Sequence, residues 1–251
     1  MSSQPHTTCP NCDHPIANET YCPNCGQRTQ LPRITFKETL ADFFSSSFSL
    51  EGPFLRTVAM LFRNPGQGFR DFLQGKRKRY YKPVPFFIVN TVIYLLLQSL
   101  VGYDPLANTN ITLTVHDEPR LIDQTGIAAR FMVTYINHIL LFLVLSIGLM
   151  SKLFFGKRYH LAEFVAVSFY VTAAYLLLGN LTMLASHYLL QPFKFINFLI
   201  LVTYITLVFP RFLQDRRFLT YLKSFVLAGS AIVLYVILGF GFSLMVVVLR
   251  G

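Results

Sequence analysis

Charged side chains are scarce in this chain of 251 residues: they account for 14% of it, whereas hydrophobic residues account for 53%. A soluble domain rarely carries so little charge. The chain also lacks an H-E-x-x-H helix, a G-x-S-x-G turn and a phosphate-binding loop, the patterns that would indicate metalloprotease, hydrolase or nucleotide chemistry. These absences leave no catalytic constellation, so we expect a membrane protein that is not an enzyme.

The amino terminus lacks the order of a cleaved secretion signal, in which basic residues precede an apolar stretch, because residues 1–8 are polar. We therefore expect the first segment to stay in the cytosol. The net charge of +10 would suit nucleic acid, but membrane proteins also concentrate Lys and Arg in their cytosolic loops. This second explanation needs no polyanionic partner, so nucleic acid is not an expected partner.

Cysteine is confined to the first 25 residues, where it forms two C-x-x-C pairs, Cys9 with Cys12 and Cys22 with Cys25. Four thiolates suit a closed tetrahedral site for Zn²⁺. The sequence predicts a zinc ribbon over residues 1–30 with structural zinc as its cofactor, in which Gly26 tolerates the positive φ that turns backbone N–H groups toward the sulfurs. Because four protein ligands leave no position open for a substrate, we expect the ribbon to dock a protein partner.

Three other interpretations of the cysteines are two disulfides, a thioredoxin-like redox pair and an iron site. Disulfides need an oxidising compartment, which the cytosol is not. A redox pair would sit in a βαβ pattern, which the sequence lacks. His6 or His14 could also replace a cysteine as a ligand, although surface positions suit both better. Zinc is therefore the favoured metal, with iron as the alternative.

Residues 31–82 form an amphipathic, basic segment ahead of the first long apolar run. Thr35 and Glu38 fit a capping box, and apolar residues then recur at helical spacing in three short stretches. These are Phe36, Leu40, Phe43 and Phe44; Phe54, Leu55, Val58, Leu61 and Phe62, after Pro53 and before the turn at 64–66; and Phe69, Phe72 and Leu73. We expect helices whose apolar faces lie in the lipid interface; the alternative is that they pack on one another or on the cytosolic ends of the spans.

Five cations stand directly before the first long apolar run: Lys76, Arg77, Lys78, Arg79 and Lys82. Each cation near an anionic leaflet contributes about 1 kcal/mol to membrane binding. We interpret the run as a membrane-surface binding site, although a topology signal alone would also account for it.

Several of these stretches occur together in one known family. The order "CPNC", "CPNCGQ", "RITFKETL" and "FLRTVAMLFRNPGQGFRDFLQGKRKRYYKPVPFF" resembles a bacterial membrane-protein family catalogued as domain of unknown function 3667. Its members similarly join an amino-terminal zinc ribbon to a juxtamembrane segment and several spans. The resemblance covers roughly residues 9–100 and implies an architecture but no activity.

Five apolar runs approach or reach the roughly 20 helical residues that cross a bilayer. They cover residues 83–101, 127–149, 164–184, 195–212 and 225–249. Lys and Arg gather before the first run, between the second and third, and between the fourth and fifth, which predicts a cytosolic amino terminus and a periplasmic or external carboxyl terminus. The expected fold class is an all-α integral protein of the bacterial inner membrane, similar in architecture to the Yip1-type proteins.

Polar residues at bilayer depth are candidates for function, because an unpaired one is costly there. His138 and Asn137 fall near the middle of the second run, at about the depth of Asn90 in the first. The simpler interpretation is that these residues only join helices. We therefore expect a membrane organising or assembly factor; the alternative is a small transporter or lipid-handling protein with a polar path at Asn90, Asn137 and His138.

Overall fold

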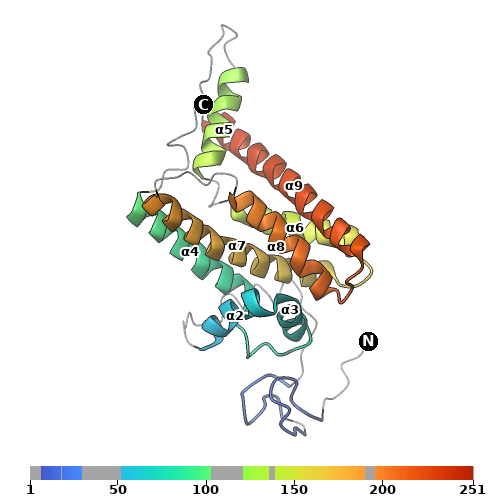
Figure 1. The fold of residues 1–251 in the computed structure, drawn as a ribbon. Helices are drawn as coiled ribbons and strands as arrows, with labels where there is room; N and C mark the ends of the chain where they lie inside the picture. The colour runs from blue at the N-terminus through green and yellow to red at the C-terminus, as the bar shows by residue number, and fades with distance from the viewer. Residues whose placement is uncertain are drawn as a thin grey trace.

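The fold is all-helical in the part of the chain that the computed structural model describes, namely residues 7–17, 19–29, 52–102, 121–135, 139–189 and 196–250. Two isolated β-bridges are the only pairing of extended backbone in these ranges. The helix expected at Phe36 lies outside the described residues. The helices are α2 (Gly52–Arg63), α3 (Pro65–Leu73), α4 (Pro83–Val101), α5 (Leu121–Thr134), α6 (Leu140–Phe155), α7 (Leu161–Leu189), α8 (Ile196–Phe212) and α9 (Phe218–Arg250) (Figure 1).

Local sequence explains where the first long helix begins and ends. Pro83 occupies the first turn of α4, where its missing N–H has no intrahelical partner to lose. Gly102 follows Val101 in the left-handed conformation with φ of 63°, and its N–H bonds back to the carbonyls of Gln98 and Ser99. The predicted first span, 83–101, is confirmed as a helix with these bounds.

Among the described residues, three helices are long and apolar enough to cross a membrane, and they lie in α4, α7 and α9. The third and fifth predicted runs fall inside α7 and α9, and the fourth matches α8 within one residue. The second prediction, one helix over 127–149, is wrong. Two helices replace it, because α5 ends at Thr134 and α6 begins only at Leu140. Apolar composition runs on through this stretch, so hydropathy alone does not reveal the break.

α7 is the central helix of the bundle. In its most apolar window 67% of the residues are buried, against 17% in α9. Large apolar side chains of α9 are instead exposed, including Phe225, Val233 and Ile237. An exposed apolar surface of this extent is unusual for a protein in water and is compatible with a lipid environment.

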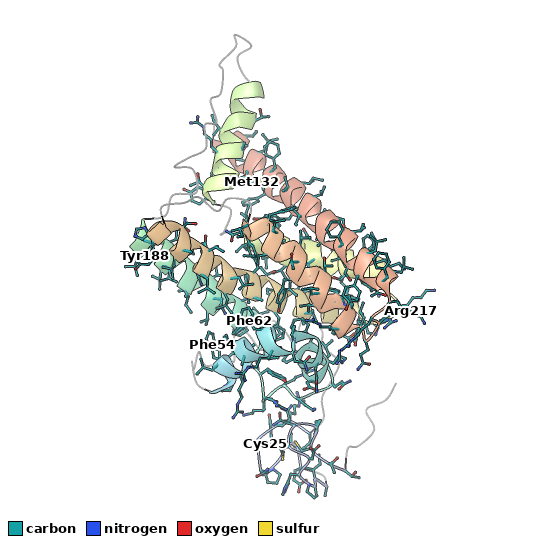
Figure 2. All side chains as sticks on the ribbon, viewed as in Figure 1. Cys25, Phe54, Phe62, Met132, Tyr188 and Arg217 are labelled. Carbon is teal, nitrogen blue, oxygen red and sulfur yellow. The ribbon has the colours of Figure 1, made fainter. Side chains whose placement is uncertain are left out.

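Contacts along α7 establish the helix directions. α4 runs parallel to it, since Phe87 packs on Phe169 with ring centroids 5.5 Å apart and Tyr94 lies beside Gly179. α8 runs antiparallel, because Thr182 in the last third of α7 donates a hydrogen bond to Asn197 at the start of α8 over 2.6 Å. α4, α7 and α9 therefore begin at one end of the bundle, and Figure 2 shows Tyr188 and Arg217 at opposite ends.

Basic side chains at the end where α6 and α8 finish are tied to backbone carbonyls. Lys152 Nζ donates to the carbonyls of Gly156 and Tyr159 at 2.8 and 3.2 Å. Arg70 donates to the carbonyls of Arg211 and Phe212. These contacts satisfy carbonyls that a helix leaves without partners in its last turn.

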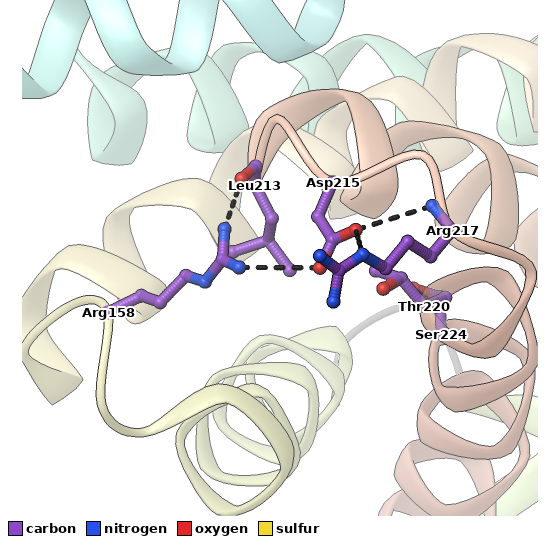
Figure 3. Close-up of polar contacts among 6 residues, drawn as sticks. All are labelled: Arg158, Leu213, Asp215, Arg217, Thr220 and Ser224. Carbon is purple, nitrogen blue, oxygen red and sulfur yellow. Dashed lines mark hydrogen bonds and ion pairs between the residues drawn. The ribbon is translucent and has the colours of Figure 1, made fainter.

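The turn between α8 and α9 is held to the turn between α6 and α7 by charged contacts (Figure 3). Arg158 donates to the carbonyl of Leu213 and to Asp215 Oδ2 at 3.3 Å. The backbone N–H of Arg217 holds the pKa of the Asp215 carboxyl below its ordinary value, and both guanidinium groups act in the same direction. Asp215 therefore stays ionised and joins the two turns.

The amphipathic helices α2 and α3 pack on this end of the bundle, as expected under the alternative interpretation, whereas Leu55 and Phe62 of α2 stay exposed, so contact of these two with the lipid interface stays a prediction. Phe69 stacks on Tyr170 of α7 at 5.8 Å between ring centroids, and Phe54 packs against Phe86 at 5.2 Å. The Tyr170 hydroxyl donates to the carbonyl of Tyr81 at 2.5 Å. Helical spacing predicts that a face is buried but not what covers it, and here the bundle covers Leu61, Phe69 and Phe72.

Glycine is required where α3 meets its neighbours. A Cβ at Gly66 would lie 2.6 Å from the carbonyl carbon of Arg211 and 2.7 Å from the backbone nitrogen of Phe212. A Cβ at Gly68 would overlap the side chain of Met60 in α2. The turn Asn64-Pro65-Gly66 thus lets the start of α3 contact the end of α8 through bare backbone.

We predict that Gly66→Ala destabilises the protein, because the added methyl group meets backbone atoms that cannot move aside. Overpacking of this kind costs typically 1–3 kcal/mol, which should lower the thermal midpoint of the helical circular dichroism signal in detergent. Gly52→Ala is the matched control, since nothing lies within 4 Å of the position its Cβ would take. Equal midpoints for the two variants would contradict the close approach.

Candidate metal centre

The cysteine segment is built from two copies of one backbone unit. In the first, Cys9 N–H donates to the carbonyl of His14 at 2.8 Å and Asp13 N–H donates to the carbonyl of Cys9 at 2.9 Å. In the second, the Cys22 N–H donates to the carbonyl of Gln27 and the Gly26 N–H donates to the carbonyl of Cys22, each at 2.8 Å. These bonds join the same positions as in the first unit. The bridges Thr8 to Pro15 and Tyr21 to Arg28 close the two units in the same way.

Each unit turns through one residue with positive φ, which lies directly after its second cysteine. Gly26 has φ of 66°, as expected from the sequence, and Asp13 has φ of 58°. Asp is among the few residues other than Gly that adopt this conformation at modest cost. Asp13 was not predicted from the sequence, although its place after the first C-x-x-C matches that of Gly26 and indicates the same turn.

The four sulfurs form one compact group. All lie within 4.8 Å of one another, with Cys9 Sγ 3.6 Å from Cys25 Sγ and Cys12 Sγ 3.7 Å from Cys22 Sγ. A disulfide bond would bring two sulfurs to about 2.05 Å. Four sulfurs bound to one metal at about 2.3 Å would stand roughly 3.8 Å apart along the edges of a tetrahedron. The spacing therefore fits a tetrahedral metal site and not two disulfides.

The thiols differ in how readily they ionise without a metal. Burial raises the pKa of Cys9 to about 12, against opposing hydrogen bonds from the N–H groups of Asn11 and Cys12. The N–H of His14 lowers the pKa of Cys12 to about 7. His14 enters this group only through its backbone, and its side chain is exposed. His6, the other histidine considered, lies outside the described residues.

A buried glutamine connects the cysteine segment to the basic run. Gln27 is 3% exposed, and its Oε1 accepts a hydrogen bond from the backbone N–H of Lys78 at 2.9 Å. The Lys78 ammonium lies beside Gly26. Nothing in the sequence pairs Gln27 with a residue 51 positions away, so this contact was not predictable from the local pattern.

The rest of the basic run is folded onto the protein. Lys76 pairs with Asp71 at 3.2 Å, and the Arg79 guanidinium lies 5.8 Å from the centre of the Tyr80 ring. Burial and the Asp71 carboxylate raise the pKa of Tyr80, whose hydroxyl donates to Asp71 Oδ2 at 3.3 Å. Arg77 and Lys82 also have partners. Binding of this run to a membrane surface stays a prediction.

Of the three polar residues expected at bilayer depth, the structure describes Asn90. Asn90 is fully buried in α4, and its Nδ2 donates to the carbonyl of Phe86 in its own helix at 2.7 Å. Asn137 and His138 lie outside the described residues. The proposed polar path through these three residues is therefore neither confirmed nor contradicted.

Together these features define a helical protein with three helices able to cross a membrane and a compact four-cysteine group at the end where those helices begin. Residues 51–95 match the family described as "Protein of unknown function (DUF3667)", which supports, over this segment, the resemblance seen in the sequence. The match covers α2, α3, the basic run and part of α4, and does not extend to the cysteine segment. Comparisons with curated proteins and with solved structures gave no match.

We predict that Gly26→Val weakens metal retention, because a β-branched residue with positive φ costs roughly 1–2 kcal/mol, or about tenfold in affinity. Asp13→Gly, at the equivalent position of the first unit, should retain metal as well as the natural chain does. Bound metal per chain, measured after competition with a chelator, checks both. Equal loss from the two variants would mean that φ at these positions does not limit the site.

Proposed function

We propose that the protein is a non-enzymatic organising or assembly factor of the bacterial inner membrane, whose cytosolic zinc ribbon docks a protein partner. The observation that carries this proposal is the group of four cysteine sulfurs at tetrahedral spacing, positioned on the membrane-proximal helices by Gln27 and Lys78. A closed site of four thiolates stabilises a fold and leaves no position for a substrate.

Zinc is the metal that best suits the segment. It accepts four thiolates without preference for another geometry, and the hydrophobic core of the segment contains only three buried residues, Cys9, Ile16 and Cys22. So small a core cannot offset the entropy of ordering the chain, so the metal supplies most of the folding free energy.

A bundle with five crossings is supported by the helix directions. α4, α7 and α9 begin at the same end, so the chain has to return to that end twice. α6 and α8 are the returning helices, with 16 and 17 residues. At about 1.5 Å per residue they span roughly 24 to 26 Å, and a bilayer adapts to a few ångströms of mismatch.

The cytosol is the proposed location of the end that carries α2, α3 and the cysteine segment. Lys152, Arg158 and Arg70 all lie at this end, as the excess of cations on cytosolic sides predicts. A reducing compartment also keeps cysteines free to bind metal.

Tyr21 supports a docking role for the ribbon. It is an aromatic residue next to a metal ligand and is 61% exposed, and exposed aromatic residues often anchor protein interfaces. The ribbon therefore offers a rigid surface with a large apolar side chain facing outward.

The first test substitutes a ligand and the exposed aromatic residue separately. Cys22→Ser should abolish bound zinc and capture of partners from native membranes in mild detergent, while the helical bundle stays folded. Tyr21→Ala should keep one zinc per chain and still lose capture, because it alters the surface and not the site. Unchanged capture by Cys22→Ser protein that has lost its zinc would contradict docking by the ribbon.

The second test addresses topology. A reporter that is active only in the periplasm should be inactive when fused before Thr7 and active when fused after Arg250, because five crossings place the two ends on opposite sides. Fluorescence from a cytosolic reporter should show the reverse pattern. Cytosolic placement of both ends would require an even number of crossings.

A small transporter or lipid-handling protein is the second candidate. Asn90 favours it, because this side chain is fully buried at mid-helix and its Oδ1 has no hydrogen-bond partner among the described residues. The discriminating variant is His138→Ala: full abundance and an unchanged cellular phenotype would remove the case for a path at Asn90, Asn137 and His138.

A further inference from the structure

A cavity of about 860 Å³ separates the cysteine segment from the hairpin of α2 and α3. Its walls come from three parts of the chain: the cysteine segment with Cys25, the facing sides of α2 and α3, and the basic run. In Figure 2, Cys25 lies beneath the α2 and α3 hairpin, on the side away from the bundle. The volume is within the range of small-molecule sites, roughly 300 to 1,000 Å³.

The lining of this cavity is strongly cationic. Arg56 and Arg63 face it from α2, where a spacing of two helical turns places them on one side, and Lys78 and Arg79 face it from the basic run. No ion pair joins any of these four side chains to another residue in the described part of the chain. Within the described residues, these four charges are therefore not paired with a carboxylate.

One carboxylate lines the cavity, and it is already engaged. Asp71 pairs with Lys76 at 3.2 Å and accepts a hydrogen bond from Tyr80. Asn64 and Gln67 add amide groups to the wall, with Asn64 Nδ2 donating to Gln67 Oε1 at 3.1 Å, which leaves the Gln67 NH₂ group as a further donor.

We propose that this cavity binds a phosphate-bearing ligand through Arg56, Arg63, Lys78 and Arg79. A guanidinium presents paired N–H donors that match phosphate oxygens, and two of them from one helix face can hold a single phosphate group. The ligand is either a soluble phosphate compound or a phospholipid headgroup, since the cavity wall at Tyr80 stands three residues before α4 enters the bundle. The proposal needs a folded cysteine segment but no protein partner, and so goes beyond the docking role.

The competing explanation is that the cations serve the metal centre. Four thiolates around a divalent ion carry two negative charges, and Cys25 borders the same cavity. In that case removing the arginines should lower metal retention. Arg56 and Arg63 lie on α2, whereas all four cysteines lie in the amino-terminal segment. If the two arginines bind a ligand, the protein should keep its metal when they are replaced.

The test uses the full-length protein with its metal, in nanodiscs of phosphatidylcholine. ATP and inorganic phosphate are the soluble probes, titrated by calorimetry. The lipid probe is phosphatidylglycerol, counted by native mass spectrometry on protein released from nanodiscs of mixed phosphatidylglycerol and phosphatidylcholine. The variant is Arg56→Gln with Arg63→Gln, and the control is Arg216→Gln with Lys223→Gln, which removes two exposed cations elsewhere at the same end.

Binding by one probe class, weakened roughly tenfold or more by the cavity variant and unchanged by the control, supports the proposal and names the source of the phosphate. Three results would overturn it: no probe binds the natural protein, both variants weaken binding equally, or the cavity variant loses its metal. Phosphate binding that persists while partner capture fails in Tyr21→Ala protein would separate this site from the docking role.

Discussion

The contact between the start of α3 and the end of α8 is the constraint on which the rest of this structure depends. Gly66 allows backbone to meet backbone there, and Arg70 then reaches the last carbonyls of α8. With α3 held there, Phe69 packs on Tyr170 of α7 and Phe54 of α2 packs on Phe86 of α4. α2 and α3 therefore cover the same end of the bundle. The cysteine segment attaches to the basic run and is therefore placed by the same contact.

This arrangement explains the range of the family match in physical terms. Residues 51–95 contain α2, the turn that leads into α3, α3 with its two glycines, the basic run and the first part of α4. The matched segment is thus one packing unit and not a string of separate motifs. Its aromatic residues contact α7 and α8, helices that lie far beyond it in the chain.

Sequence patterns were sufficient where the cause is local. The bounds of α4 follow from Pro83 and Gly102, and the cysteine group follows from two C-x-x-C pairs, whose chelating geometry is set within five residues. Sequence patterns did not predict features that depend on a residue far away in the chain. The packing of Leu61 and Phe69 on the bundle and the bond from Lys78 to Gln27 depend on surfaces that hydropathy and spacing do not encode.

The returning helices bring one further electrostatic consequence. α6 and α8 direct the negative ends of their dipoles toward the basic end of the bundle, whereas α4, α7 and α9 direct positive ends there. Lys152, Arg70 and Arg158 are bonded to the carbonyls at those two negative ends, so the cations that stand out in the sequence as a sidedness signal also cancel the unfavourable dipoles. Glu163 accepts a hydrogen bond from the backbone N–H of His160 at the start of α7, and Asp215 accepts one from the backbone N–H of Arg217 just before α9. The start of α4 has no acidic residue in its first turn, so the positive end of its dipole still favours an anion that approaches from the water.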